Sequence, residues 1–153
     1  MSKIEDRLIE LGVVLPQPVA PVANYVPFVR SGNIVHISGQ ISLDAAGGIK
    51  GTVGVDVDLD TARKAARLCG INLLAQMKAA CDGDLDRVVR VVKLGGFVQA
   101  GPDFIDIPKV INGCSDLMVE VFGDAGRHAR SAVGVYRLPL GFAVEVDAVV
   151  EIA

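Results

Sequence analysis

The chain has 153 residues, a net charge of −3 and a mean hydropathy of +0.45, values typical of a single domain with a sizeable core. It contains no charge-free apolar run of about 18 residues that could span a membrane, and no apolar N-terminal segment typical of a signal peptide. We therefore expect a cytoplasmic protein, with no nucleic-acid partner because basic residues form no cluster. The excess of apolar residues favours a subunit interface.

The first 21 residues are predicted to form a helix and a connector ahead of a core at 22–153. Ser2 and Glu5 have the spacing of a capping box, and the apolar residues between them and Gly12 recur at helical spacing. The proline-rich stretch 15–21 is expected to run extended over the surface. We treat 1–153 as one domain, because no linker or low-complexity segment divides it.

Residues 26 to 57 are predicted to form strands. Apolar residues favour strands at 26–30 and 33–37, and Ser31-Gly32 favours the turn between them. Shorter apolar runs at 41–43 and 49–57 are expected to continue the sheet on either side of a glycine-containing turn.

Apolar residues at spacings of three and four predict two helices. The first runs from Asp60, its expected N-cap, to about residue 80, and the second runs from 107 to 122, with Asp106 as its cap. A β-branched strand at 88–98 lies between them, and Gly95-Gly96 suggests a bulge in it. The order of elements predicts an α+β domain of two layers, with a mixed sheet and both helices on one face.

The last 24 residues carry the strongest functional pattern. Alternation in the final strand places Glu145, Asp147 and Glu151 on one face and apolar residues on the other. Arg130 opens the preceding strand, and the turn at 138–141 is expected to pair the two strands as a hairpin. A cation beside a row of carboxylates predicts a site for a small anion and a water molecule.

Other motifs do not predict a site. The acids at 56–60 lack the glycine and glutamate that a calcium loop needs, and two histidines without a Cys-x-x-Cys pair make a zinc site improbable. We expect His36 to be a packed, hydrogen-bonded residue of a strand. For His128, which is close to Arg130, a surface position is favoured, and the alternative is that it lines the mouth of a pocket. The three cysteines, Cys69, Cys81 and Cys114, are expected to be reduced and buried. No metal or cofactor is predicted.

Several motifs together resemble the RidA/YjgF family of imine and enamine deaminases, also described as endoribonucleases L-PSP. The resemblance covers residues 22–153, and the N-terminal helix is similar to that of a longer branch of the family. It departs from the family at Ala132, often a cysteine, and at Asn24, usually proline or a small residue. The matching motifs are Ala129-Arg130-Ser131, Leu138-Pro139, Val144-Glu145-Val146-Asp147-Ala148-Val149, Ile37-Ser38-Gly39-Gln40-Ile41, Tyr25 at 15 residues before Gln40, and Val110-Ile111-Asn112.

This resemblance implies a chorismate-mutase-like subunit and a homotrimer whose sheets form a central barrel, with three clefts between subunits. It implies that Arg130 holds the substrate carboxylate, that Glu145 holds or activates water, and that Tyr25, Ser38 and Asn112 line the cleft. The expected activity is that of a 2-iminobutyrate/2-iminopropanoate-type deaminase, which hydrolyses 2-imino or enamino acids to 2-keto acids and ammonia. The alternative is a non-catalytic trimer that binds small carboxylates, as a metabolite sensor or chaperone-like scaffold. A ribonuclease fits the acidic charge less well.

Overall fold

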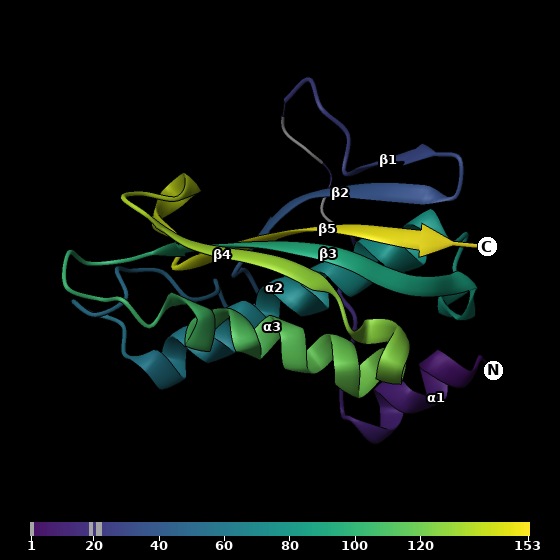
Figure 1. Ribbon diagram of the computed structural model, residues 1–153, viewed down its shortest axis with the longest axis horizontal. Helices are drawn as coiled ribbons and strands as arrows, with labels where there is room; N and C mark the ends of the chain where they lie inside the picture. Colours follow the sequence, from purple (N-terminus) through teal and green to yellow (C-terminus); the bar gives the residue numbers. More distant parts are fainter. Residues whose placement is uncertain (1, 19, 21–22) are drawn as a thin grey trace.

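The computed structural model describes residues 2–18, 20 and 23–153, and its central element is a five-stranded sheet with two long helices on one face (Figure 1). The α+β, two-layer prediction is therefore confirmed. The strands are β1 Phe28–Ser31, β2 Ile34–Ile41, β3 Val88–Gln99, β4 Ala129–Val135 and β5 Val144–Ile152. The helices are α1 Lys3–Glu10, α2 Leu59–Ala80 and α3 Ile107–Phe122, with short 3-10 helices η1 Leu85–Arg87, η2 Gly123–Gly126 and η3 Pro139–Gly141.

The sheet is mixed, with the strand order β1-β2-β5-β3-β4. Three of the four pairings are antiparallel, and β3 pairs with β4 in parallel, because α3 carries the chain back across the sheet between them. The predicted hairpin of the last two strands is therefore wrong. β5 lies between β2 and β3, and β4 forms an edge of the sheet.

The segment that resembles a hairpin turn instead carries the chain over the end of β3. Leu140 adopts a left-handed conformation there, with φ 59°, and Gly141 follows with φ 77°. The buried side chain of Gln99, the last residue of β3, fixes the crossing. Its Oε1 accepts a hydrogen bond from the Leu138 N–H at 2.8 Å, and its Nε2 donates to the Gly51 carbonyl at 2.9 Å. A buried amide thus satisfies backbone groups in two loops.

The core lies between the sheet and the two long helices. Alternate residues of β5 are fully or almost fully buried against the helices, as the sequence predicts: Val144, Val146, Ala148, Val150 and Ile152. Small residues let α2 and α3 pack closely, since a β-carbon at Gly113 would overlap the Arg63 carbonyl. The cysteines are buried and free, which confirms that prediction. The α3 bounds also match the prediction, although Asp106 makes no side-chain capping bond.

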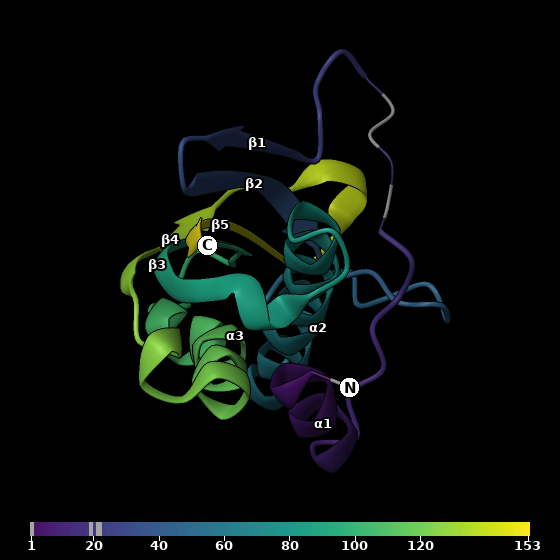
Figure 2. The same ribbon diagram turned by 90° about the vertical axis from the view of Figure 1, so that its right-hand side faces the viewer.

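The N-terminal helix α1 packs beside the end of α3 (Figure 2). Ser2 caps it as predicted, accepting from the Glu5 N–H at 3.1 Å. A second cap comes from η1, where the Asp86 carboxylate accepts from the N–H groups of Lys3 and Ile4, each at 2.9 Å. Arg7 donates to the Glu120 carbonyl of α3 at 2.8 Å. The sequence predicts the helix, and contacts from distant segments hold it in place.

Three local predictions are wrong. The N-cap of α2 is Asp58, whose Oδ1 accepts from the Thr61 N–H at 2.8 Å, so the helix begins before Asp60. Residues 41–57 continue the sheet only through the last residue of β2 and isolated bridges. The pairing of β3 with β5 is regular at Gly95-Gly96 and irregular nearer the start of β3. These glycines instead leave room for Asp147 and Ile111, respectively.

The predicted connector, 15–21, includes residues 19 and 21, which lie outside the described residues. Its other residues have no regular secondary structure and are mostly exposed. No helix within the described ranges has the length and apolar character needed to cross a membrane.

Candidate functional site

The predicted site residues form two separate groups, and the first surrounds Glu145. Its half-buried carboxylate lies in a pocket of about 320 Å³ between β2, β5 and the segments that precede β1 and follow β4. We call this the Glu145 pocket. Tyr25 and Ser38 also line it. Apolar residues form most of the remaining wall: Pro27, Ile41, Leu43, Pro139 and Leu140.

An irregularity in β2 shapes the Glu145 pocket. The register of β2 against β5 shifts between Ile37 and Gln40, at Ser38-Gly39. Ser38 Oγ donates to the Val26 carbonyl at 2.7 Å and so fixes the segment next to Tyr25. At Gly39 a β-carbon would lie 2.9 Å from Glu145 Cδ. Only glycine at this position therefore leaves room for the carboxylate where it lies. Local distortion of one strand thus positions the acid of another.

The acids of this face are less acidic than usual. Burial raises the pKa of Glu145, and the charge of Asp147 raises it further. Burial also raises the pKa of Asp147, against the opposing effects of the Gly95 N–H and of Lys93. Within the described part of the chain no cation forms an ion pair with either acid. A partly buried carboxylate with a raised pKa is a suitable proton acceptor for a bound water.

The second group surrounds Arg130 at the start of β4. Arg130 Nη1 donates to Asn112 Oδ1 at 2.8 Å and to Ser115 Oγ at 3.1 Å, both on α3. Ser115 Oγ lies 2.9 Å from His128 Nε2, and His128 Nδ1 lies 2.6 Å from the Gly126 carbonyl. We call Asn112, Ser115, His128 and Arg130 the Arg130 cluster. All four side chains are half-buried.

In one chain the two groups lie on opposite faces of the sheet. Arg130 pairs with Leu94, whose side chain is buried beneath the helices, and its own side chain donates to Asn112 of α3. Glu145 alternates with the buried Val144 and Val146, so it points to the face that no helix covers. The sequence predicts Arg130 beside the acids on adjacent strands, and this is wrong within one chain. Tyr25, Ser38 and Glu145 lie together, and Asn112 and Arg130 lie together.

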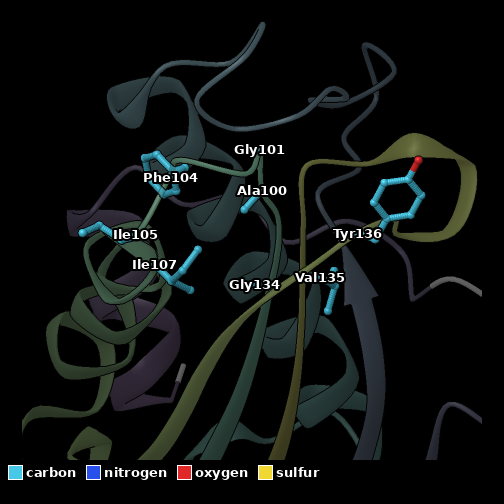
Figure 3. Close-up of a pocket in the computed structure, with 8 residues that line it drawn as sticks. All are labelled: Ala100, Gly101, Phe104, Ile105, Ile107, Gly134, Val135 and Tyr136. Carbon is cyan, nitrogen blue, oxygen red and sulfur yellow. The ribbon is translucent and has the colours of Figure 1, made fainter.

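A second cavity, of about 430 Å³, opens where β3 and β4 end (Figure 3). Figure 3 shows Phe104, Ile105 and Ile107 on one side of β4, while Tyr136 lies on the other and points away from them. Ile105 and Tyr136 are 83% and 80% exposed. The phenol of Tyr136 is the only titratable side chain in this lining, whose other side chains are apolar.

Sequence reasoning missed Gly39 and Ser115 and misplaced both histidines. His128 is half-buried and hydrogen-bonded rather than a surface residue, whereas His36 is exposed rather than packed. Two signals could have revealed the Arg130 cluster. Ser115 follows Asn112 by three residues on one helix face, and His128, which comes directly before β4, precedes Arg130 by two residues. Of the two departures from the family pattern, Ala132 packs against the core and Asn24 is exposed.

Comparisons with known proteins agree with the motifs. A family model described as "YjgF/chorismate_mutase-like, putative endoribonuclease" matches residues 5–151. Protein TCP17 of Trypanosoma cruzi is 48% identical over 153 residues, which cover 99% of this chain and 95% of that protein. A 2-iminobutanoate/2-iminopropanoate deaminase of Dermatophagoides farinae is 31% identical over 137 residues, covering 90% of each.

The solved structures also include a similar fold. The crystal structure of the Agrobacterium tumefaciens protein Atu1372, whose function is described as unknown, superposes with a TM-score of 0.92. It is 50% identical, and the match covers 98% of this chain and 92% of that one. The family model spans nearly all of the chain, and the α+β mixed sheet agrees with a chorismate-mutase-like subunit. The chain therefore belongs to the RidA/YjgF family.

Proposed function

We propose that the protein hydrolyses 2-imino acids to 2-keto acids and ammonia, in clefts that combine the Glu145 pocket of one chain with the Arg130 cluster of another. The observation that carries this proposal is the separation of two complementary half-sites within one chain. One half-site holds a carboxylate with a raised pKa beside a pocket, and the other holds an arginine without a carboxylate partner among the described residues.

A rotationally symmetric homotrimer supplies the second copy. Arg130 lies on β4, which is an edge strand, and contacts α3, whereas Glu145 lies on the middle strand β5 and points to the face that no helix covers. Contact between unlike surfaces of successive copies closes into a ring when the rotation allows it, so every chain contributes both half-sites. Exposed apolar residues at both edges support such contacts, among them Val29 and Val133, which are 53% and 46% exposed.

The chemistry needs a carboxylate ligand and a proton acceptor. Arg130 binds the substrate carboxylate with paired charge-assisted hydrogen bonds. Water held by Glu145 adds to C2 of the C=N group, and Glu145 takes a proton from it and returns the proton to nitrogen. Glu145 then moves the proton of the C2 hydroxyl to the amino nitrogen, so the C2–N bond breaks as the keto group forms and nitrogen leaves as ammonia. General-base catalysis by one side chain contributes roughly 100-fold or more, and fixed orientation adds to it.

The direct test is an imine-decay assay with and without the protein, in which an amino-acid oxidase generates the imine. We expect faster loss of imine and a trimer by light scattering. A monomer at micromolar concentration would contradict the shared cleft. Saturable binding of a 2-keto acid without acceleration would instead assign the alternative role, a carboxylate-binding trimer without catalysis.

Complementation between two inactive variants tests whether the cleft is shared. Arg130→Ala and Glu145→Gln should each lack activity, but trimers assembled from equal amounts of both should recover about one quarter of wild-type activity, because random assembly leaves that share of clefts with both residues. A mixture of Glu145→Gln with the double variant is the control and should stay inactive. No recovery in mixed trimers would place both residues in a cleft of one chain and contradict the proposal.

A further inference from the structure

We propose that Ser115 and His128 are positioning residues, which hold the Arg130 guanidinium in its substrate-binding orientation through a hydrogen-bond chain anchored on the backbone at Gly126. This inference rests on the proposed role of Arg130 as the carboxylate ligand. It goes beyond that role because it assigns a function to two side chains that need not touch the substrate.

The direction of donation along this hydrogen-bond chain follows from its last acceptor, the Gly126 carbonyl. The Gly126 carbonyl can only accept, and it lies 2.6 Å from His128 Nδ1, so Nδ1 carries the proton. In the neutral ring Nε2 is then an acceptor, and the Ser115 hydroxyl donates a hydrogen bond to it at 2.9 Å. With its proton directed to His128, the Ser115 oxygen presents a lone pair to Arg130 Nη1 at 3.1 Å. Each hydrogen bond thus fixes the next.

This chain determines which edge of the guanidinium remains for a ligand. Nη1 carries two hydrogens, and Asn112 Oδ1 and Ser115 Oγ each accept from it. Nη2 and Nε of Arg130 make no hydrogen bond within the described residues, so the Nε–Nη2 edge is the one that can bind a carboxylate through two parallel bonds. The same two acceptors define the plane in which that edge lies.

The cluster also preserves the positive charge of Arg130. The groups that orient it are the Asn112 amide, the Ser115 hydroxyl and the His128 imidazole. Burial and the charge of Arg130 lower the pKa of His128, although its hydrogen bond to Gly126 opposes this. None of them is an acid, so they orient the guanidinium without neutralising it. An aspartate or glutamate in their place would satisfy the same N–H groups but would compete with the substrate for the charge.

Two replacements of His128 separate its role in the hydrogen-bond chain from its local structural role at Gly126. In His128→Asn the side-chain amide can still donate to the Gly126 carbonyl but cannot reach Ser115. In His128→Gln the longer side chain offers an oxygen near the position of Nε2. We expect His128→Asn and Ser115→Ala to raise KM for a 2-imino acid on the order of 3- to 10-fold with little change in kcat, because Asn112 still holds Nη1 and a bound substrate keeps its orientation, while the less ordered guanidinium binds the carboxylate more weakly. His128→Gln should restore most of the affinity.

The double variant Ser115→Ala/His128→Asn tests whether His128 acts through Ser115. It should be no worse than Ser115→Ala alone, whereas independent roles would multiply the two effects. Titration with 2-oxobutyrate should show the same pattern in Kd. An active wild-type protein with unchanged KM in both single variants would overturn this inference alone. A wild-type protein that neither accelerates imine loss nor binds 2-oxobutyrate would overturn the proposed function and this inference with it.

The ring nitrogens provide a readout that needs no activity. In the full-length protein with 15N-labelled histidine, NMR should show His128 protonated at Nδ1 and unprotonated at Nε2 at neutral pH. Ser115→Ala should change the Nε2 resonance, because it removes the donor to that nitrogen. The opposite tautomer, or an Nε2 resonance that Ser115→Ala does not move, would overturn the proposed hydrogen-bond chain, whatever the kinetics show.

Discussion

The backbone of Gly39 and the carboxylate of Glu145 are in such close contact that a β-carbon at residue 39 would lie 2.9 Å from Glu145 Cδ and 3.0 Å from its Oε1. The two residues belong to neighbouring strands, β2 and β5, and they meet where the register of those strands shifts. The position of the acid therefore depends on the absence of a side chain at residue 39.

Gly39→Ala should move the carboxylate while leaving the fold intact. The conflict is with the end of a flexible side chain, so Glu145 can rotate away at small cost in stability. Activity should fall by at least tenfold, mainly in kcat, because a displaced general base loses its contribution. Steady-state kinetics and a melting curve would check this. Gly95→Ala is the matched control, since its β-carbon would displace Asp147 instead. Equal activity of Gly39→Ala and wild type would remove Glu145 from the catalytic role.

Arg130→Ala should abolish turnover and leave the chain folded. Its partners are neutral and half-buried, so water can replace part of what is lost, and each hydrogen bond of the charged guanidinium is worth at most about 1.5–3 kcal/mol of folding free energy. Arg130→Lys should not restore activity, because an ammonium cannot present a planar pair of donors. Kinetics, circular dichroism and light scattering together decide the matter. A variant that loses trimer and activity in parallel would instead identify Arg130 as a structural residue.

Asp147→Asn should shift the acid limb of the pH-rate profile. The proposed base works when Glu145 is ionised, and the charge of Asp147 raises the pKa of Glu145. Removal of that charge lowers the pKa of Glu145, so the rise of kcat/KM with pH should occur at lower pH. A limb that stays in place, or moves to higher pH, would show that another group controls it.

Glu145→Gln should stabilise the protein at neutral pH while removing activity. The pKa of Glu145 is raised in the folded state, so ionisation opposes folding once the pH exceeds its ordinary value of 4.5. The variant lacks this cost. Its melting temperature should exceed that of the wild type at pH 7, and the difference should vanish below about pH 4. A lower melting temperature for the variant at pH 7 would mean that the folded protein gains from the charge.

Asp86→Asn should loosen α1 without affecting the sheet. The N–H groups of Ile4 and Lys3 lower the pKa of Asp86, so its stabilising contribution is present above its ordinary value of 3.8 and is lost as the pH falls through the folded pKa. Hydrogen exchange should become faster in α1 of the variant, and in α1 of the wild-type protein at low pH. The exposed Asp103 provides a matched control substitution. Unchanged protection of α1 in Asp86→Asn would refute this role of the cap.

The elements that the sequence predicts well are those defined by local signals. The bounds of α3 follow from its apolar period and from Gly123, which ends the helix with φ 62°. The alternation in β5 likewise gives its two faces correctly, because one face is buried along the whole strand. These signals lie within the segment itself.

The strand order could not be predicted from such signals. Leu138-Pro139-Leu140-Gly141 has the composition of a hairpin turn, but β3 lies between the strands that it connects. The side chain that fixes this crossing is Gln99, 39 residues away from Leu138. For the same reason the sequence predicts Arg130 and Glu145 as site residues but places them on adjacent strands. Pairing between distant strands depends on tertiary packing, which local periodicity does not encode.

The position of β5 has a consequence for how the protein is made. β5 follows every other strand along the chain, yet it is the middle strand that joins β1-β2 to β3-β4. During synthesis the two strand pairs can form first, but each exposes an unpaired edge until residues 144–152 emerge. Nascent chains that stall before β5 should therefore be prone to aggregation and targets for chaperones, even though both long helices and the other four strands have already been synthesised.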